Sequence, residues 1–254
     1  MNQFGWCSGI EQASLFAEHG FDYIECALTS LQLEDEQAHA EKLQQFQDAP
    51  LQVRATNIFV PKGISVVGPH VDEARIQRYV YKAGAALSAL GVKVAVFGSG
   101  NSRMIPEGWD HQQAEAQMLH MLGTISQEWS GNGVTLAIEP LNRKECNFIN
   151  SVAEAAALAE QINTPNVKVL ADFYHMDEEN EPLDTIIEHR DWIAHIHLAD
   201  TGRFAPGTGS YPYERFAAIL KEIHYTGMLS AECTLQGTDN ELADSLTFMR
   251  STFG

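Results

Sequence analysis

The sequence is poor in basic residues and has no long apolar run. Its 16 Lys and Arg residues are outnumbered by 34 Asp and Glu residues, which gives a net charge of −18. Proteins that bind nucleic acid or anionic membranes need a basic surface to neutralise phosphate groups, so we expect neither partner. No apolar stretch is long enough for a transmembrane helix, and we therefore expect no membrane-spanning segment.

Cysteine is scarce and dispersed. Cys7, Cys26, Cys146 and Cys233 form no CxxC motif and lie far apart in the sequence. The residues 1–6 lack the basic segment followed by an apolar one that marks a secretory signal. We therefore expect a reduced, cytoplasmic protein.

The chain alternates between short apolar segments that favour strands and longer amphipathic segments that favour helices. Several strand segments are apolar throughout, as strands buried on both faces are. We predict strands at Phe4–Cys7, Tyr23–Cys26, Leu51–Ile58, Val92–Phe97, Val134–Glu139, Val167–Asp172, Ile193–Leu198 and Met228–Glu232. We predict helices at Ile10–His19, Val71–Leu90, His111–Trp129, Ser151–Gln161, Tyr213–His224 and Asp239–Phe253.

Eight strands, most of them followed by a helical segment, in 254 residues are typical of a (β/α)8 TIM barrel. A doubly wound open sheet alternates in the same way, but no Gly-rich dinucleotide fingerprint follows the first strand. Gly20 and Gly91 indicate helix ends, and Ser151 with Glu154 indicates a helix start. No Pro-, Gly- or Ser-rich linker divides the chain. We predict an α/β fold with a single TIM-barrel domain at 1–254.

Polar residues follow the ends of four successive strands. Glu139, Asp172 and Glu232 end the fifth, sixth and eighth predicted strands, and the seventh carries His195 and His197. In a parallel barrel these ends meet at one mouth. A single acid there usually caps a helix or pairs with an arginine. Four successive strand ends with such residues favour a shared site.

Three carboxylates gathered with an imidazole would repel one another unless a cation or protons intervened. This donor set suits one divalent metal ion, with Mn²⁺ as our first choice and Mg²⁺, Co²⁺ or Zn²⁺ as alternatives. His195 and His197 share a face of the strand, and we prefer His197 because it lies nearer the strand's end. Glu25, on the second strand, has two open interpretations: a contact to a substrate hydroxyl, or a buried partner of Arg54.

The motifs at these strand ends resemble the xylose isomerase-like (β/α)8 superfamily, specifically its sugar phosphate isomerase/epimerase branch, which includes the ketose 3-epimerases. The similarity covers nearly the whole chain and is most specific in the second half. It is carried by Ile138–Arg143 with Glu145, Asp172–Met176, His195–Asp200 with Arg203, Pro206–Gly209 and Gly227–Glu232. Softer matches are Asn57, Phe97–Gly100, Arg103 and Pro106–Gly108.

The resemblance implies a role for seven residues. The implied metal ligands are Glu139, Asp172, His197 and Glu232. Glu139 and Glu232 would also act as the catalytic acid–base pair. The implied substrate-binding residues are Glu145, His175 and Arg203, although Arg203 is also close enough in sequence to pair with Asp200.

The implied reaction is proton abstraction next to a carbonyl. A metal ion that binds the carbonyl oxygen and a neighbouring hydroxyl would stabilise a cis-enediolate. Return of the proton to the opposite face gives an epimer, and return to the neighbouring carbon gives an isomer. The substrate would be a small sugar: a free ketose, a sugar acid, hydroxypyruvate and a phosphorylated sugar all stay open. Candidate cations for an anionic group are Arg103, Arg143, Lys144 and Arg203.

Three alternatives belong to other functional classes. An inosose-type dehydratase would share the proton abstraction but expel a hydroxyl, with His175 as candidate acid. An apurinic-site endonuclease would need further metal-binding histidines, where the third and fourth strands instead offer Asn57 and Phe97–Gly98. A binding protein without activity has no need for three converging acids. A homo-oligomer is a further expectation, since barrels often pair through their loops.

Overall fold

The strands pair in chain order into a closed parallel barrel. The computed structural model of the protein describes residues 2–254. The strands are β1 (Gln3–Cys7), β2 (Tyr23–Ala27), β3 (Val53–Asn57), β4 (Val94–Phe97), β5 (Thr135–Ile138), β6 (Val167–Asp172), β7 (Ile193–Leu198) and β8 (Met228–Ala231). The barrel closes where β8 pairs with β1, with Met228 opposite Gln3. This confirms the predicted TIM barrel.

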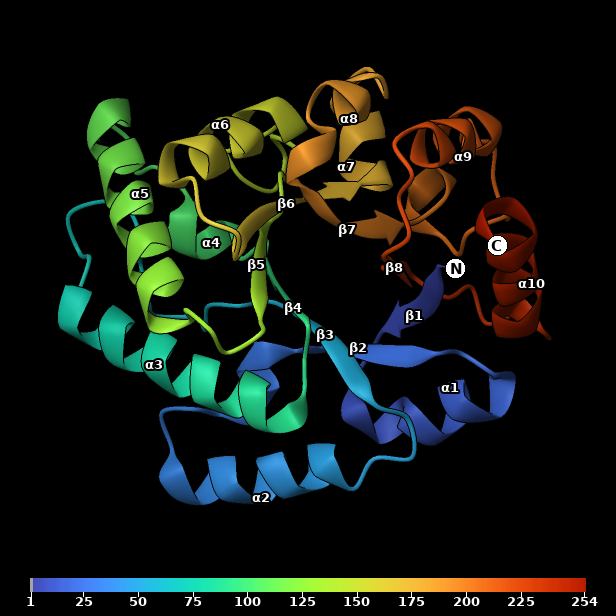
Figure 1. Ribbon diagram of the computed structural model, residues 1–254, viewed down its shortest axis with the longest axis horizontal. Coiled ribbons are helices and arrows are strands. Elements are labelled where there is room, and N and C mark those ends of the chain that lie inside the picture. The colour runs from blue at the N-terminus through green and yellow to red at the C-terminus, as the bar shows by residue number, and fades with distance from the viewer. Residues whose placement is uncertain (1) are drawn as a thin grey trace.

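Helices surround the barrel on its outside (Figure 1). They are α1 (Ala13–His19), α2 (Glu36–Gln47), α3 (Glu73–Leu90), α4 (Gly100–Arg103), α5 (His111–Glu128), α6 (Val152–Ile162), α7 (Phe173–Glu178), α8 (Thr185–Glu188), α9 (Tyr213–Glu222) and α10 (Glu241–Phe253). Across residues 2–254, none of them combines the length and apolar character that crossing a bilayer requires. The two ends of the described chain meet, since Asn2 Nδ2 donates a hydrogen bond to the Phe253 carbonyl at 2.9 Å.

Local sequence signals set several helix ends. Gly20 and Gly91 adopt φ of 86° and 70° directly after α1 and α3, a left-handed conformation that glycine tolerates best. The Ser151 hydroxyl accepts the backbone N–H of Glu154 at 3.1 Å and caps α6. These three predicted signals are confirmed.

The helix α2 lies in a segment where apolar periodicity predicts none. Eight of its twelve residues are polar, and Phe46 is its only buried residue. Asp35 caps the start of the helix, since its carboxylate accepts the N–H of Ala38 at 3.0 Å. Because a single buried side chain gives no helical period, the pattern of apolar residues carries no signal for α2. The short helices α4, α7 and α8 are also absent from the prediction, because none is long enough to show a helical period.

Apolar side chains form two clusters. The larger one combines residues of strands and helices, for example Ile24 on β2, Leu87 on α3 and Phe216 on α9. The smaller one contains strand residues alone: Tyr23, Ala55, Val94, Val96, Ala137, Leu170 and Met228. Side chains alternate between the two faces of a strand, so the two clusters correspond to the outside and the inside of the barrel. Because each strand is packed on both faces, the positions of the strand ends are fixed.

Trp129, which directly follows α5, is buried against α3. Its indole N–H donates to the carbonyl of Val80 at 3.0 Å. A Cβ atom added at Gly84 on α3 would lie 2.6 Å from atoms of the Trp129 ring. A Cβ atom added at Gly123 on α5 would meet no atom within 4 Å. The two helical glycines therefore differ in what an alanine would encounter.

We expect Gly84→Ala to lower the free energy of unfolding by about 1–2 kcal/mol, because overpacking outweighs the better helix propensity of alanine. The matched control Gly123→Ala should raise the free energy of unfolding by about 0.5–1 kcal/mol, since it gains propensity without a clash. Urea unfolding followed by circular dichroism measures both. A Gly84→Ala variant as stable as the parent would contradict the packing of Trp129.

Candidate metal centre and active site

A cavity of about 700 Å³ opens at the carboxyl ends of the strands. Its walls come mostly from the loops that follow β3, β4 and β5, with Arg203 and Glu232 on the other side. Glu139, Glu145 and His175 line the same space. This is the end of the barrel where strand-terminal side chains converge.

Four side chains come together at this end of the barrel, and two of them, Glu139 and Glu232, line the cavity. Asp172 is the last residue of β6, His197 lies near the end of β7, and Glu139 and Glu232 follow β5 and β8. His197 Nδ1 lies 3.3 Å from Glu139 Oε1, 3.7 Å from Asp172 Oδ2 and 3.6 Å from Glu232 Oε2. One ligand atom from each residue lies within 4.8 Å of all the others. The structure thus brings together the four predicted ligands.

The donor atoms of this cluster are kept free of other partners. Glu139 Oε1 and His197 Nδ1 are buried, and neither has a hydrogen-bond partner among the described residues. Asp172 uses Oδ1 to accept the N–H groups of Tyr174 and His175, which leaves Oδ2 to face His197. Buried polar atoms without partners are rare because they are costly, so an additional positive group fits here.

The chain also makes room for Glu139. A Cβ atom added at Gly98 would lie 2.0 Å from Glu139 Oε2, so only glycine leaves space for this carboxylate. Arg103 is fully buried and donates to the carbonyls of Phe97 at 3.3 Å and of Glu139 at 2.6 Å. It joins the ends of β4 and β5 and thereby fixes the backbone from which Glu139 projects.

The cluster perturbs the pKa values of its members. Burial raises the pKa of Glu139, and the neighbouring charge of Glu232 raises it further. Burial alone would lower the pKa of His197, but the surrounding carboxylates, Glu25 first, hold it well above its ordinary value. Burial would also raise the pKa of Asp172, yet the imidazoles of His175 and His197 and the charge of Arg203 hold it well below its usual range. The site therefore favours positive charge at its centre.

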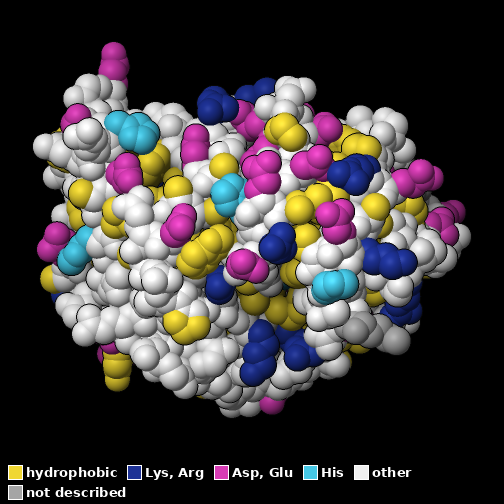
Figure 2. All heavy atoms as spheres, turned by 45° about the horizontal axis from the view of Figure 1, so that its top comes forward, with side chains coloured by type: hydrophobic (Ala, Val, Ile, Leu, Met, Phe, Trp, Pro, Cys, Tyr) yellow, Lys and Arg dark blue, Asp and Glu magenta, His cyan; other side chains and the backbone are white. Residues whose placement is uncertain are grey.

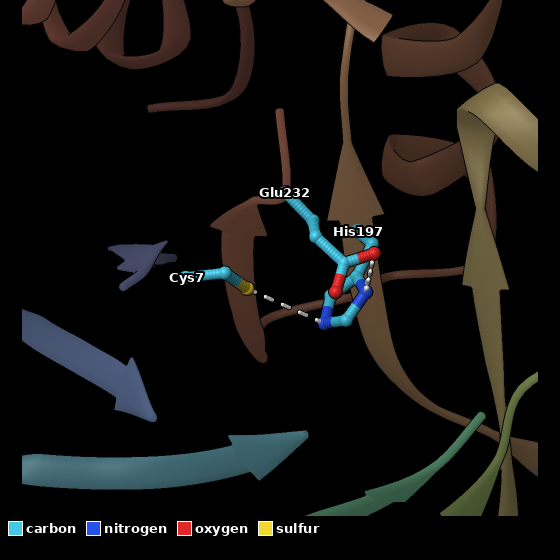
Figure 3. Close-up of side chains that lie close together, drawn as sticks. All are labelled: Cys7, His197 and Glu232. Atoms are coloured by element: carbon cyan, nitrogen blue, oxygen red, sulfur yellow. Dashed lines mark hydrogen bonds and ion pairs between the residues drawn. The ribbon is translucent and has the colours of Figure 1, made fainter. Parts of the chain in front are cut away.

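Cys7, His197 and Glu232 form a second close group (Figure 3). Cys7 Sγ lies 4.0 Å from His197 Nε2, whereas Glu232 lies beside Nδ1. Burial and the charge of Glu25 raise the pKa of Cys7 well above its ordinary value. Three carboxylates gather around His197 Nδ1, whereas Cys7 lies at Nε2, which also contacts Glu25. The set of Glu139, Asp172, His197 and Glu232 therefore offers more ionised donors around one nitrogen.

Three further predicted residues surround this cluster. Arg203 donates to Glu232 Oε2 at 2.9 Å and to Glu145 Oε1 at 3.2 Å. His175 accepts the backbone N–H of Asn142 on Nδ1 at 3.2 Å, so the neutral imidazole carries its proton on Nε2. That Nε2 atom has no hydrogen-bond partner in the described chain.

The two arginine pairings that the sequence left open, Arg203 with Asp200 and Arg54 with Glu25, do not form. Asp200 accepts backbone N–H groups, including that of Thr201 at 2.8 Å, and does not bind Arg203. Asn57, a softer match, donates to Glu232 Oε1 at 2.9 Å. Arg54 donates to Gln3 at 2.9 Å. Glu25 is thus not its partner.

Glu25 contacts two histidines instead, which the sequence interpretation missed. Its carboxylate lies 2.8 Å from His195 Nε2 and 3.0 Å from His197 Nε2, and all three side chains are fully buried. Burial would raise the pKa of Glu25, but the two imidazoles hold it well below its usual range. Two features of the sequence could have indicated this contact: an acid within the apolar strand β2, and two histidines on one face of the strand β7.

The candidate cations differ in position. Arg103 is buried away from the cavity, and Arg143 and Lys144 pair with Glu179 and Glu178. The face in Figure 2 mixes basic and acidic side chains.

Known proteins resemble this chain in sequence and in fold. The xylose isomerase-like TIM barrel family matches residues 13–252. The 3-dehydro-D-guloside 4-epimerase of Escherichia coli (strain K12) is 30% identical over 133 residues, 51% of this chain and 51% of that protein. The L-ribulose 3-epimerase of Methylomonas sp. (strain DH-1) is 25% identical over 240 residues, 92% of this chain and 82% of that protein.

A solved structure of D-psicose 3-epimerase, determined in the presence of D-fructose, has the same fold, with a TM-score of 0.85 at 20% identity over 99% of both chains. The chain spans about half the length of the Escherichia coli relative and 40% of a D-psicose 3-epimerase from Enterocloster bolteae (strain ATCC BAA-613 / DSM 15670 / CCUG 46953 / JCM 12243 / WAL 16351). The family match covers nearly the whole barrel, and the chain belongs to the xylose isomerase-like TIM barrel family.

Proposed function

We propose that this chain is a divalent-metal-dependent epimerase or isomerase of a small hydroxyketone sugar. The observation that carries the proposal is the cluster of Glu139, Asp172, His197 and Glu232, with two buried donor atoms that lack partners. Two of its members, Glu139 and Glu232, line an open cavity large enough for a sugar. The relatives named above are sugar epimerases, which supports the same reaction class.

The four side chains would hold one divalent ion, with Mn²⁺ as first choice and Mg²⁺, Co²⁺ or Zn²⁺ as alternatives. Three carboxylates and one imidazole suit any of these ions. When bound, the ion supplies Lewis-acid stabilisation of negative charge that develops on substrate oxygens. Protein residues carry out the remaining steps.

Glu139 and Glu232 act as the acid–base pair in this proposal. One carboxylate removes the proton from the carbon next to the carbonyl, and the other carboxyl group returns a proton. Return to the opposite face of the same carbon inverts its configuration. Return to the neighbouring carbon moves the carbonyl. Epimerisation relocates only this carbon-bound proton, whereas isomerisation also transfers the proton of the neighbouring hydroxyl to the former carbonyl oxygen.

His175, Glu145 and Arg203 position the substrate. The free Nε2–H of His175 donates to a substrate oxygen, while Glu145 accepts from a substrate hydroxyl. Arg203 lies with its guanidinium 4.8 Å from the centre of the Tyr174 ring, and its pairing with Glu232 holds that carboxylate in place. This arrangement places donors and acceptors around one small polyol.

An uncharged sugar suits the cavity better than a phosphorylated one. Of the cavity's two basic side chains, Lys62 and Arg203, Arg203 is already bound to two carboxylates. Three acidic side chains, Glu139, Glu145 and Glu232, line the same space. A phosphate group would therefore meet more negative than positive charge.

Hydrogen exchange tests the reaction class directly. The protein is loaded with Mn²⁺ and incubated in D₂O with a panel of free ketoses, phosphorylated ketoses and a cyclic keto-polyol, and mass spectrometry follows deuterium entry at carbon and loss of water. We expect deuterium at a C–H next to the carbonyl of a free ketose, and its position separates epimerase from isomerase. Loss of water from a cyclic keto-polyol would instead indicate a dehydratase with His175 as acid. Absence of both reactions across the panel would contradict the proposal.

Glu232→Gln should lower the exchange rate by about 10²–10⁴-fold, because an amide cannot accept the proton. The matched control Glu178→Gln changes an acid that pairs with Lys144 outside the cavity, and it should keep the parental rate. Circular dichroism confirms that both variants fold. Near-parental exchange by Glu232→Gln would contradict the two-carboxylate mechanism.

Gly98→Ala should weaken Mn²⁺ binding at least about tenfold, because the added methyl group displaces the Glu139 carboxylate from its ligand position. Competition with a chelating dye measures the affinity without reference to activity. Gly123→Ala, which meets no neighbouring atom, serves as the control for a glycine replacement. Unchanged Mn²⁺ affinity in Gly98→Ala would contradict the expectation that the space at Gly98 keeps Glu139 in a ligand position.

A further inference from the structure

A buried polar network lies behind the metal ligands, inside the barrel. Glu25 on β2 is its centre, and its carboxylate receives three donors. Oε1 contacts His197 Nε2 at 3.0 Å, whereas Oε2 contacts His195 Nε2 at 2.8 Å and Ser230 Oγ at 2.5 Å. Each of these side chains is fully buried. The network thus joins β2, β7 and β8 across the interior.

The direction of each hydrogen bond follows from the chemistry of the groups. A carboxylate only accepts, so both imidazoles present Nε2–H and Ser230 donates its single proton to Glu25. Tyr23 OH lies 2.7 Å from Ser230 Oγ and therefore donates to it. Glu25 is held from two sides, by His195 and by the Tyr23–Ser230 pair. Its carboxylate has little freedom to rotate.

This arrangement decides which nitrogen of His197 is available to a metal ion. With Nε2–H directed at Glu25, the lone pair of the neutral ring lies on Nδ1. Nδ1 is the atom that faces Glu139, Asp172 and Glu232 at 3.3–3.7 Å. A histidine that binds a metal usually donates its other N–H to a carboxylate, which fixes the ring and raises its basicity.

We propose that Glu25 is a positioning residue that fixes His197 in the tautomer and orientation needed for metal binding through Nδ1. The inference rests on the proposed function, because it assumes that His197 is a ligand. Glu25 does not line the cavity and is not one of the four clustered side chains, which it contacts only through His197. His195 and Ser230 hold Glu25 in place and do not bind the ion.

The first test measures Mn²⁺ affinity of the full chain by dye competition. Glu25→Gln retains the shape of the side chain but removes its charge and one acceptor, and we expect affinity to fall about 10–100-fold. Ser230→Ala leaves the Glu25–His197 contact intact and should lower affinity less. Thermal unfolding of the metal-free proteins separates this effect from lost stability. Parental affinity in a folded Glu25→Gln variant would overturn the inference.

The second test needs no variant. In Zn²⁺-loaded protein with ¹⁵N-labelled histidine, NMR reports which His197 nitrogen carries a proton. We expect a slowly exchanging Nε2–H and a metal-bound Nδ1, and a proton on Nδ1 would overturn the inference. If the parental chain binds neither Mn²⁺ nor Zn²⁺, the proposed function fails and this inference with it. If it binds both but His197 shows the other tautomer, only this inference fails.

Discussion

Carboxylates that share a buried space repel one another, and three of them meet at the mouth of this barrel around His197. Removal of such charges from water costs several kcal/mol for each ion unless compensating groups are at hand. The surroundings supply them: Arg203 and Asn57 donate to Glu232, and two backbone N–H groups donate to Asp172. Glu139 receives no such donor on Oε1. The compensation is thus incomplete at the centre, where a divalent cation would complete it.

The barrel makes this concentration of charge tolerable because its apolar clusters fix each strand end independently of the site. Because successive side chains of a strand point to opposite faces, every second residue points into the barrel. On β7 this rule brings His195 and His197 to the same interior face, two residues apart. His197 lies beside the three carboxylates, and His195 lies one step further inside the barrel. The polar network around Glu25 therefore extends the site downward into a region that is otherwise apolar.

The convergence of Glu139, Asp172 and Glu232 could be predicted because each is an acid at the end of an apolar strand, whereas on β7 the choice of His197 over His195 rested on its place nearer the strand's end and on the family resemblance. The helix ends at Gly20 and Gly91 could also be predicted, because a single glycine follows the last turn. The partners of Glu25 could not be predicted in this way. They lie on strands 170 or more positions further along the chain, and only the closed barrel brings these strands together. The room that Gly98 leaves for Glu139 is likewise a property of two strands, not of either segment alone.

Asp172 shows why the simple and the functional interpretations of a strand-end acid need not compete. One of its oxygens caps α7 through the N–H groups of Tyr174 and His175, and the other faces the cluster. The cap orients the carboxylate, so the local helix start determines where the second oxygen points. His197 divides its two nitrogens in the same manner, with Nε2 toward Glu25 and Nδ1 toward the cluster. In both residues a structural contact on one atom leaves the other atom directed at the site, so the scaffold orients both candidate ligands without needing an ion.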